Sequence, residues 1–362
     1  MLYRRRRKLG YRDMLNKLYK SGIMGLVVGD ALGVPSEYAS HEELMTDPVN
    51  GMNEPGVYGL PKGCWSDDSA LTIATLENIC DSGLEHSLHS MMDNMIRYID
   101  DPLLNPMGKY MSPGTTTLES AEHYRNDKNP DTCGGRNIND NGNGALMRIL
   151  PVCIYLWKRM YVEKRAWMKA EPGSFRYLTT KCGALENVIQ LIESVSALTH
   201  AHIISRTACG IYYFMVEAVI ENASNDTQLS MNEVLNRAFQ RSVLYYMLDT
   251  DENRRTAMKE FDFLGVDPAE YYSKEWNMEK VYDCSAYVVD TLRAAAACLA
   301  TTESYEECML KCVNLGGDTD TIAAITGGIA GLYYGYDSIP GEWLEELQMR
   351  DNVEALCDRM DS

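Results

Sequence analysis

The chain has 362 residues, 45% of them hydrophobic, and its formal net charge is −18 at pH 7. A chain of this length can bury a large core, and an acidic body repels bulk nucleic acid, which argues against a groove that follows phosphates. No uninterrupted apolar run approaches 18 residues, so a membrane span is not expected.

Basic residues are concentrated at the start of the chain, where the first 20 residues hold 8 of the 34 Lys and Arg residues. We expect residues 1–10 to form a solvated tail, with contact to an acidic partner as the alternative. No apolar block follows the arginines, as a signal peptide would require, and the eleven cysteines include no Cys-x-x-Cys pair. These features indicate a cytoplasmic protein with reduced thiols.

The first predicted helix covers residues 11–29, where apolar residues follow a helical spacing. Small residues in the stretch 29–33 allow close backbone packing, and Pro35 is expected to stop the helix. Glu37 then lies on a loop, where by itself it is compatible with an exposed side chain of no function.

A loop rich in Gly, Pro and Asn at 46–64 leads to the first acidic cluster, Ser66-Asp67-Asp68. The cluster is predicted to cap a helix at about 68–80. An acidic side chain at this end of a helix meets the positive pole of the helix dipole, for about 0.3 to 1 kcal/mol. By itself the cluster is therefore compatible with an ordinary N-cap.

The most polar uncharged stretch covers residues 123–144 and ends in Asn137-Ile138-Asn139-Asp140-Asn141-Gly142-Asn143-Gly144. It is either a flexible connection or a binding loop that offers backbone N–H groups to a ligand. The apolar run at 145–157 predicts a buried helix kinked at Pro151. His200 and His202 lie on a turn between two later helices, where they are candidates for metal ligation or for contact with a substrate.

Convincing strands are nearly absent, so the fold is predicted to be all-helical. A basic, aromatic segment at 157–181 is expected to be an excursion from the core, and a charged stretch at 248–280 an ordered insertion. A loop is expected at 102–116. Further helices are predicted at 87–100, 182–197, 202–221, 230–246, 285–300, 304–313 and 341 to about 358.

The second acidic cluster, Asp318-Thr319-Asp320-Thr321, repeats the design of the first, with a glycine turn before it and an apolar helix opened by Thr321. An N-cap is again the ordinary interpretation, but the two clusters together provide four carboxylates with flanking hydroxyls. If folding brings them together, their charges match two divalent cations. Hard oxygen ligands favour Mg²⁺, Mn²⁺ or Ca²⁺ over zinc or copper.

Six motifs together resemble the ADP-ribosylglycohydrolase family, which contains dinitrogenase-reductase-activating glycohydrolase. The motif at residues 315–321 is highly specific by itself, and the shared order and spacing of all six motifs make the resemblance strong. They are Gly29-Asp30-Ala31-Leu32-Gly33 with Glu37, Ser66-Asp67-Asp68, Gly142-Asn143-Gly144-Ala145-Leu146-Met147-Arg148, Leu198-Thr199-His200, Ser285-Ala286-Tyr287 and Leu315-Gly316-Gly317-Asp318-Thr319-Asp320-Thr321.

The resemblance implies a compact all-α orthogonal bundle in which residues 11–362 form one domain, with insertions near 157–181 and 248–280. It also implies a binuclear Mg²⁺ or Mn²⁺ centre in a cleft. The implied metal ligands are Ser66, Asp67, Asp68, Asp318, Asp320 and Thr321. The family more often has threonine at the position of Ser66, whose hydroxyl retains the ligand oxygen. The resemblance further implies that Gly142, Asn143, Gly144, Ala145 and His200 line the ADP-ribose pocket.

The activity implied by the resemblance is metal-dependent hydrolysis of the N- or O-glycosyl bond between ADP-ribose and an acceptor. The substrate would be an ADP-ribosylated protein, with arginine as the first candidate acceptor, or a small molecule. Asp67, Asp68 and Glu37 are the candidate catalytic residues for proton transfer. Two alternatives are a two-metal nucleotide phosphohydrolase and a non-catalytic relative that binds ADP-ribose or has a structural role.

Overall fold

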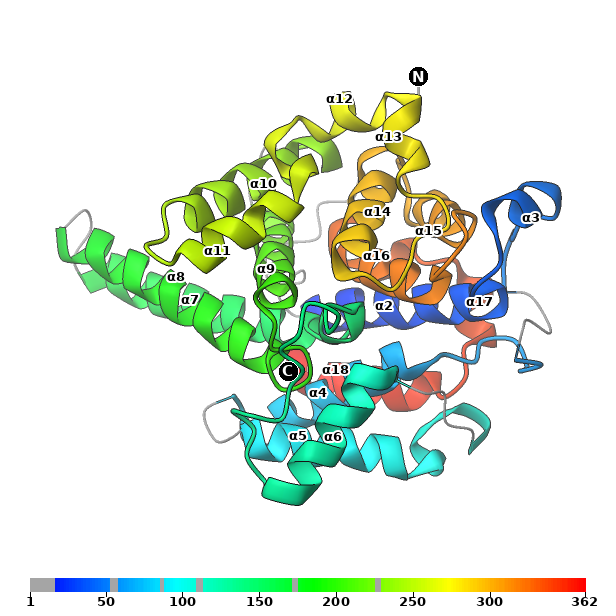
Figure 1. Cartoon of the computed structure of the whole chain (residues 1–362), viewed down its shortest axis with the longest axis horizontal. Coiled ribbons are helices and arrows are strands. Elements are labelled where there is room, and N and C mark those ends of the chain that lie inside the picture. Colours follow the sequence, from blue (N-terminus) through cyan, green and yellow to red (C-terminus); the bar gives the residue numbers. More distant parts are fainter. Residues whose placement is uncertain (1–16, 53–57, 85–87, 109–112, 171–174, 225–228) are drawn as a thin grey trace.

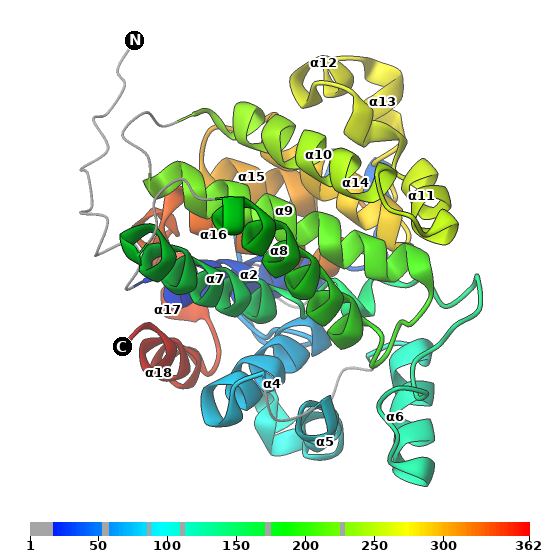
Figure 2. The ribbon, with the colours of Figure 1, turned by 90° about the vertical axis from the view of Figure 1, so that its left-hand side faces the viewer.

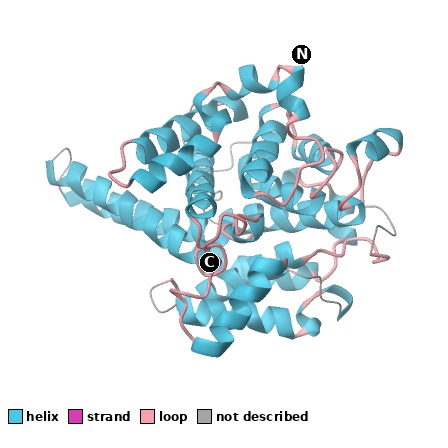
Figure 3. Cartoon of the chain, in the orientation of Figure 1, coloured by secondary structure: helices cyan, strands magenta, loops and turns pink. Residues whose placement is uncertain are grey.

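Helices make up the regular structure of the protein, as Figures 1 and 3 show. The computed structural model describes residues 17–52, 58–84, 88–108, 113–170, 175–224 and 229–362. Within these ranges no β-sheet forms, and strand-like pairing is limited to isolated bridges between loops. The predicted all-α fold class is therefore confirmed.

The helices are described by their bounds in chain order. They are α2 (Leu18–Gly33), α3 (His41–Thr46), α4 (Asp67–Ser82), α5 (Leu88–Asp100), α6 (Thr115–Asp127), α7 (Leu150–Ala170), α8 (Phe175–Ser196), α9 (Ile203–Ser224), α10 (Met231–Met247), α11 (Glu252–Ala257), α12 (Pro268–Tyr272), α13 (Glu275–Glu279), α14 (Val288–Ala300), α15 (Tyr305–Val313), α16 (Thr319–Tyr334), α17 (Gly341–Glu346) and α18 (Arg350–Asp361). Short 3-10 turns lie at Val34–Ser36, Pro102–Leu104, Pro106–Gly108, Asn143–Ala145, Met258–Glu260, Asp262–Gly265 and Tyr336–Ser338.

Helices α2 and α16 run side by side through the middle of the protein (Figures 1 and 2). Their backbones touch, because glycines spaced four residues apart on α2 face α16. A Cβ added to Gly25 would lie 2.4 Å from the carbonyl oxygen of Gly327, and one added to Gly29 would lie 2.2 Å from that of Ala323. Only a residue without a side chain fits at these positions.

The prediction that the first helix ends at Gly29 is wrong, because α2 continues to Gly33. The glycines permit close approach to α16 and do not break the helix. The helix then stops before Pro35, as expected, and a 3-10 turn follows. Residues 11–16, which the prediction placed in this helix, lie outside the described residues.

The predicted kink at Pro151 is also absent. Helix α7 begins at Leu150, so Pro151 lies in its first turn, where a missing N–H breaks no intrahelical hydrogen bond. The predicted helices at 68–80, 87–100, 202–221, 230–246, 285–300 and 304–313 are present as α4, α5, α9, α10, α14 and α15.

The predicted last helix is two helices, α17 and α18, separated at residues 347–349. Met349 has a φ of 56°, a left-handed conformation that ends helical geometry. The break lets the chain contact the loop before the first acidic cluster, since the Gln348 N–H donates to the Gly63 carbonyl and the Trp65 indole donates to the Gln348 carbonyl.

Two predicted loops contain helical structure. The stretch 102–116 includes two 3-10 turns, and the start of the polar stretch 123–144 is the end of α6. Helix α3, inside the loop region after Glu37, was not predicted; a capping box at Ser40 and Glu43 begins it.

The segment 157–181 is helical where it is described, as parts of α7 and α8, which extend side by side away from the other helices in Figure 1. The stretch 248–280 folds into short helices that bury Phe261, Phe263 and Tyr272. The division into a basic tail and one domain with two insertions stays a prediction.

The core is one continuous apolar cluster that includes residues of α2, α4, α7, α9, α14 and α16. Helix α9 contains an apolar stretch long enough to span a membrane. However, 83% of that stretch is buried inside the protein, as in the core helix of a globular protein. The ten cysteines whose side chains are described are all free, in agreement with the predicted reduced thiols.

We predict that Gly25→Ala destabilises the protein by about 3 kcal/mol, at the upper end of the usual overpacking cost, because the new methyl group meets rigid backbone of α16. Urea unfolding of the variant and the wild type measures the difference. The matched control is Gly341→Ala at the start of α17, where an added Cβ has no neighbour within 4 Å. Equal stability of the two variants would contradict the close packing of α2 and α16.

A second prediction concerns the contact of α18 with α2. Partial burial would raise the pKa of Glu354, but hydrogen bonds from Tyr336 and Arg350 and the ammonium of Lys20 outweigh it and lower the pKa to about 2. Because this pKa lies below the unfolded value of about 4.3, the stabilisation is present above about pH 5 and is lost as the pH falls toward 2.

Glu354→Gln should therefore lower the free energy of unfolding more at about pH 7 than at about pH 3. Urea titrations of both proteins at the two pH values measure this difference. A loss of the same size at both values would show that the charge of Glu354 contributes nothing.

Candidate active site and metal centre

The two acidic clusters meet in the folded protein, although 253 residues separate the groups that touch. The Thr321 hydroxyl on α16 donates a hydrogen bond of 3.3 Å to Oδ2 of Asp68 on α4. The Ser66 hydroxyl donates to the same oxygen at 3.0 Å. The first turns of α4 and α16 therefore meet in one buried site, which we call the acidic junction.

Asp30 on α2 holds the start of α4 in place. Its carboxylate accepts hydrogen bonds from the backbone N–H groups of Ser66 and Ser69, at 3.0 and 2.9 Å, and from the Ser69 hydroxyl at 2.5 Å. Gly33, three residues further along α2, lies against the backbone of Asp320, where a Cβ would come within 2.3 Å of the Asp320 Cα. Helix α2 thus connects both acidic clusters.

The loop that carries Glu37 is joined to the glycine turn before α16. The Tyr38 N–H donates to the Gly317 carbonyl at 2.8 Å, and the Gly317 N–H donates to the Ala39 carbonyl at 2.9 Å. Tyr38 has a φ of 63°, which is rare for a bulky residue. This pairing turns Glu37 inward, so that it is 7% exposed and lies beside Asp318 and Asp320. The interpretation of Glu37 as an exposed loop residue is therefore wrong.

Carboxylate oxygens in the junction are close enough to share cations. Two groups of three residues each have ligand atoms within 4.8 Å of one another. One consists of Asp30, Asp68 and Asp320, and the other of Glu37, Asp318 and Asp320. Asp320 belongs to both groups, so the two sets of oxygens adjoin.

Burial and mutual repulsion destabilise the charged forms of these carboxylates. Burial, then Asp30 and Asp67, raise the pKa of Asp68. Burial, then Asp318 and Asp68, raise the pKa of Asp320. Burial raises the pKa of Asp30 to about 6 in spite of its hydrogen bonds. The clustered negative charge needs a counterion.

The residues present fit divalent cations. Oδ1 of Asp68 and Oε2 of Glu37 are buried and have no hydrogen-bond partner in the described part of the chain. None of the six carboxylates Asp30, Glu37, Asp67, Asp68, Asp318 and Asp320 forms an ion pair with a described Lys, Arg or His. Buried acceptors without donors or cationic partners are what a site for hard cations such as Mg²⁺ or Mn²⁺ offers.

The predicted ligand Asp67 lies near these groups without belonging to either set of three. Its pKa is raised by burial and by Asp30, Glu37 and Asp318. The Ser66 hydroxyl caps α4 by accepting from the Asp68 N–H at 3.2 Å, so the N-cap interpretation is correct as well. The assignment of Ser66, Asp67 and Thr321 as metal ligands stays a prediction.

The loop Gly142–Ala145 reaches the acidic junction through one side chain. The Asn143 amide donates to Oδ2 of Asp318 at 2.5 Å and to the Thr291 hydroxyl at 3.0 Å. The bridge between Gly142 and Tyr287 attaches the loop to the start of α14. The loop is therefore fixed beside Asp318 and is not a flexible connection.

His200 lies against this loop, and His202 has a different place. A Cβ on Gly142 would come within 3.2 Å of Nε2 of His200, and one on Gly144 within 2.9 Å of its Cε1. His202 is half-buried, and its Nδ1 accepts a 3.4 Å hydrogen bond from the Ile204 N–H at the start of α9. The structure thus brings His200, but not His202, to the glycine loop.

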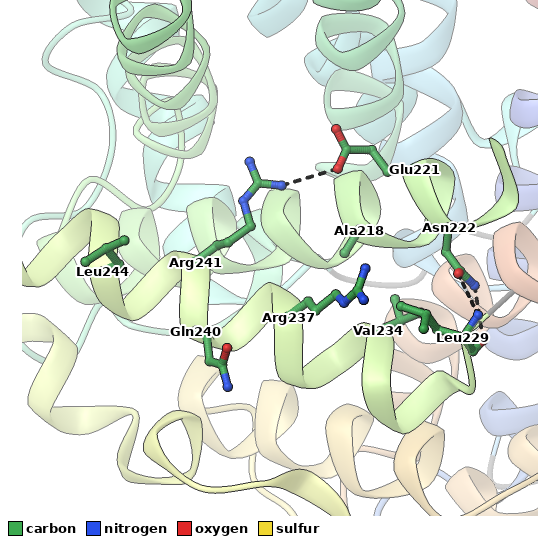
Figure 4. A pocket seen from close by; sticks show the side chains of 9 residues that line it. All are labelled: Ala218, Glu221, Asn222, Leu229, Val234, Arg237, Gln240, Arg241 and Leu244. Atoms are coloured by element: carbon green, nitrogen blue, oxygen red, sulfur yellow. Dashed lines mark hydrogen bonds and ion pairs between the residues drawn. The ribbon is translucent and has the colours of Figure 1, made fainter. Parts of the chain in front are cut away.

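A hollow of about 460 Å³ opens beside the junction. Asp318 and Gly317 line it together with the Tyr38–Ser40 loop and residues 283–286. Another hollow, of about 400 Å³, lies between α9 and α10 (Figure 4) and is lined by none of the six carboxylates. Arg241 at its edge is already ion-paired with Glu217 and Glu221. The hollow beside Asp318 is therefore the candidate substrate site.

Two features of the site were not predicted from the sequence. The sequence motifs include Asp30 without assigning it a role, although a lone acidic residue in the otherwise uncharged run 21–36 is a signal for a buried functional carboxylate. Tyr58 and Tyr38 were also missed. Burial raises the pKa of Glu37, while hydrogen bonds from these two phenols lower it.

Comparisons with known proteins agree with this geometry. A family model described as ADP-ribosylglycohydrolase matches residues 12–362. An ADP-ribosylarginine hydrolase of Serratia proteamaculans is 25% identical over 94% of this chain and 78% of its own length. The ADP-ribosyl-[dinitrogen reductase] glycohydrolase of Rhodospirillum rubrum is 24% identical over 90% of this chain and 89% of its own length.

A solved structure, titled as an ADP-ribosylglycohydrolase-related protein complex, superimposes with a TM-score of 0.65. It is 23% identical and covers 96% of this chain and 98% of its own. At this identity the likeness supports the fold.

We predict that Mg²⁺ or Mn²⁺ stabilises the protein by about 2.7 kcal/mol when present at a hundred times its dissociation constant. Asp320→Asn should remove most of this effect and stabilise the ion-free protein, because one of the repelling charges is gone. Thermal unfolding with and without each ion measures both changes. Asp337→Asn, at an exposed position, is the matched control. Unchanged melting of the wild type with either ion would contradict the metal centre.

Proposed function

Because this chain belongs to the ADP-ribosylglycohydrolase family, we propose that it hydrolyses the glycosidic bond between ADP-ribose and an acceptor. ADP-ribosyl-arginine on a protein is the first candidate substrate, since the Serratia relative is named as an ADP-ribosylarginine hydrolase. The observation that carries the proposal is the junction of buried carboxylates, which pair with no described Lys, Arg or His, beside a fixed glycine loop.

The ligands of a binuclear Mg²⁺ or Mn²⁺ centre would come from both acidic clusters and the Glu37 loop. Asp68, Asp318, Asp320 and Glu37 would supply carboxylate oxygens, with Asp67 and the hydroxyls of Ser66 and Thr321 completing the set. Bound cations of this kind bind ribose hydroxyls and lower the pKa of a coordinated water.

The chain's own residues would position the substrate and transfer the proton. The fixed loop Gly142–Ala145 offers backbone N–H groups to the diphosphate, which suits a site whose described residues include no basic patch. Asn143 couples that loop to Asp318, so the diphosphate end and the reacting end of the substrate are held at a set distance. Asp67, Asp68 and Glu37 are the candidates for protonation of the leaving group.

The acceptor is proposed to lie in the hollow lined by Tyr38, Ser40 and Asp283–Ala286, next to Asp318. Two acidic residues, Asp283 and Asp318, line this hollow. Their negative charges favour a cationic acceptor such as a guanidinium over a neutral hydroxyl. A cytoplasmic location is proposed as well, and the free cysteines support it.

We predict release of ADP-ribose from an ADP-ribosyl-arginine peptide in the presence of Mg²⁺ or Mn²⁺, and its loss in EDTA. Asp318→Asn and Asp67→Asn should lower kcat/KM by about 100-fold or more, because each removes a charge from the proposed metal centre. Chromatography of released ADP-ribose measures the rates, and the exposed Asp337→Asn is the control.

An ADP-ribosyl-serine peptide and a plain nucleoside diphosphate complete the experiment. Faster cleavage of the serine peptide would contradict the arginine preference. Release of phosphate from the nucleotide, with ADP-ribosyl-arginine left intact, would overturn the proposed function in favour of a phosphohydrolase.

A further inference from the structure

Arg148, at the end of the motif that begins with Gly142, is fully buried and has no carboxylate partner among the described residues. Its NH2 group uses both protons, in hydrogen bonds of 3.0 Å to the Val195 carbonyl and 2.9 Å to the Thr199 hydroxyl. Its Nε and NH1 have no described partner. A guanidinium left so incompletely paired is costly to bury, which points to a role beyond packing.

The Thr199 hydroxyl lies between Arg148 and His200. Its oxygen accepts from Arg148, and the oxygen lies 3.0 Å from Nδ1 of His200. No other partner for the hydroxyl proton is found in the described part of the chain, so this proton is satisfied only if Nδ1 is the acceptor. A neutral imidazole that accepts at Nδ1 carries its proton at Nε2.

Nε2 of His200 faces the glycine loop. It lies 3.2 Å from the position that a Cβ on Gly142 would occupy, and within the described residues it has no hydrogen-bond partner. The next residue of the loop, Asn143, contacts Asp318. The ring therefore presents one unused N–H group to the loop at the edge of the acidic junction.

We propose that Arg148 and Thr199 are positioning residues that hold His200 in its Nε2-protonated tautomer, so that the ring donates a hydrogen bond to an oxygen of ADP-ribose bound over residues 142–145. The proposal rests on the proposed function for the identity of the ligand. The relay from Arg148 through Thr199 to His200 stands on the geometry alone.

The donor does not depend on a protonated ring. Burial, and after it the charge of Arg148, lower the pKa of His200 to about 3, against a small opposite effect of Asp140. The ring is therefore neutral at physiological pH, and its donor atom is set by the tautomer. Arg148 contributes twice, since its charge disfavours imidazolium and its hydrogen bond orients the Thr199 hydroxyl toward Nδ1.

The test compares Thr199→Val, which removes the hydroxyl and keeps the shape, with Thr199→Ser, which keeps the hydroxyl. The ring nitrogens of His200 are observed by ¹⁵N NMR in the full chain, and its signals are identified among those of the six histidines by their absence in His200→Asn. The wild type and Thr199→Ser should show a protonated Nε2 and a bare Nδ1. Thr199→Val should gain the other tautomer.

Ligand binding supplies the functional readout. Thr199→Val should weaken ADP-ribose binding about tenfold in calorimetry, raise KM more than it lowers kcat, and leave the unfolding temperature near that of Thr199→Ser. ADP serves as a second ligand. The same loss with ADP assigns the acceptor oxygen to the diphosphate end, and a loss confined to ADP-ribose assigns it to the distal ribose.

A wild-type His200 protonated at Nδ1, or equal affinities of the two Thr199 variants for both ligands, would overturn the inference. Either result is independent of whether ADP-ribosyl-arginine is hydrolysed, since hydrolysis by the wild type tests the proposed function alone. Conversely, an Nε2-protonated ring in a protein without hydrolase activity would reject the proposed function and keep the relay.

Discussion

The contact on which the site depends is the backbone packing of α2 on α16. Glycines at 25, 29 and 33 remove the side chains that would otherwise separate the helices. The last two lie beside Asp30, so the acidic turn of α2 is pressed against the first turn of α16. The carboxylates of α4 reach the same point because Asp30 holds two backbone N–H groups of that helix. The close packing of α2 on α16 therefore creates the acidic junction.

Repulsion among the carboxylates of the acidic junction destabilises the protein, and the packing of the rest of the fold offsets this cost. Carboxylates that raise one another's pKa destabilise the ion-free state, and the helices carrying them are held together by a large apolar core. A site of this kind is preorganised, since Asp30 on α2 and Asp320 on α16 cannot move apart without breaking the contact of the two helices, and Asp30 also holds the start of α4. Preorganised oxygens give a cation its partners without further rearrangement.

The sequence pattern predicted most helices and the capped start of α4, because periodicity and capping are local properties. Helix α16 begins at Thr319, two residues before the predicted start, and the side chain of Asp318 does not cap it. The end of α2 was misjudged because Gly29 has the same appearance in a sequence whether it ends a helix or lets another helix approach. The break at Met349 has no local signal either, since methionine rarely adopts a positive φ and does so here for contacts with a distant loop. That Asp68 and Thr321 touch, and that Glu37 turns inward, are consequences of tertiary packing. The pairing of the two clusters was a hypothesis until the fold placed them.

Substrate binding adds a second electrostatic constraint, because an anionic diphosphate must bind beside a cluster of carboxylates. An exposed Lys or Arg there would pair with the carboxylates and occupy the oxygens that the cations need. Neutral donors avoid this competition: backbone N–H groups of the loop and an imidazole whose proton lies on Nε2 both offer hydrogen bonds without adding a charge. Arg148 then fits as a buried cation that orients the imidazole donor through Thr199 and forms no ion pair with a described carboxylate.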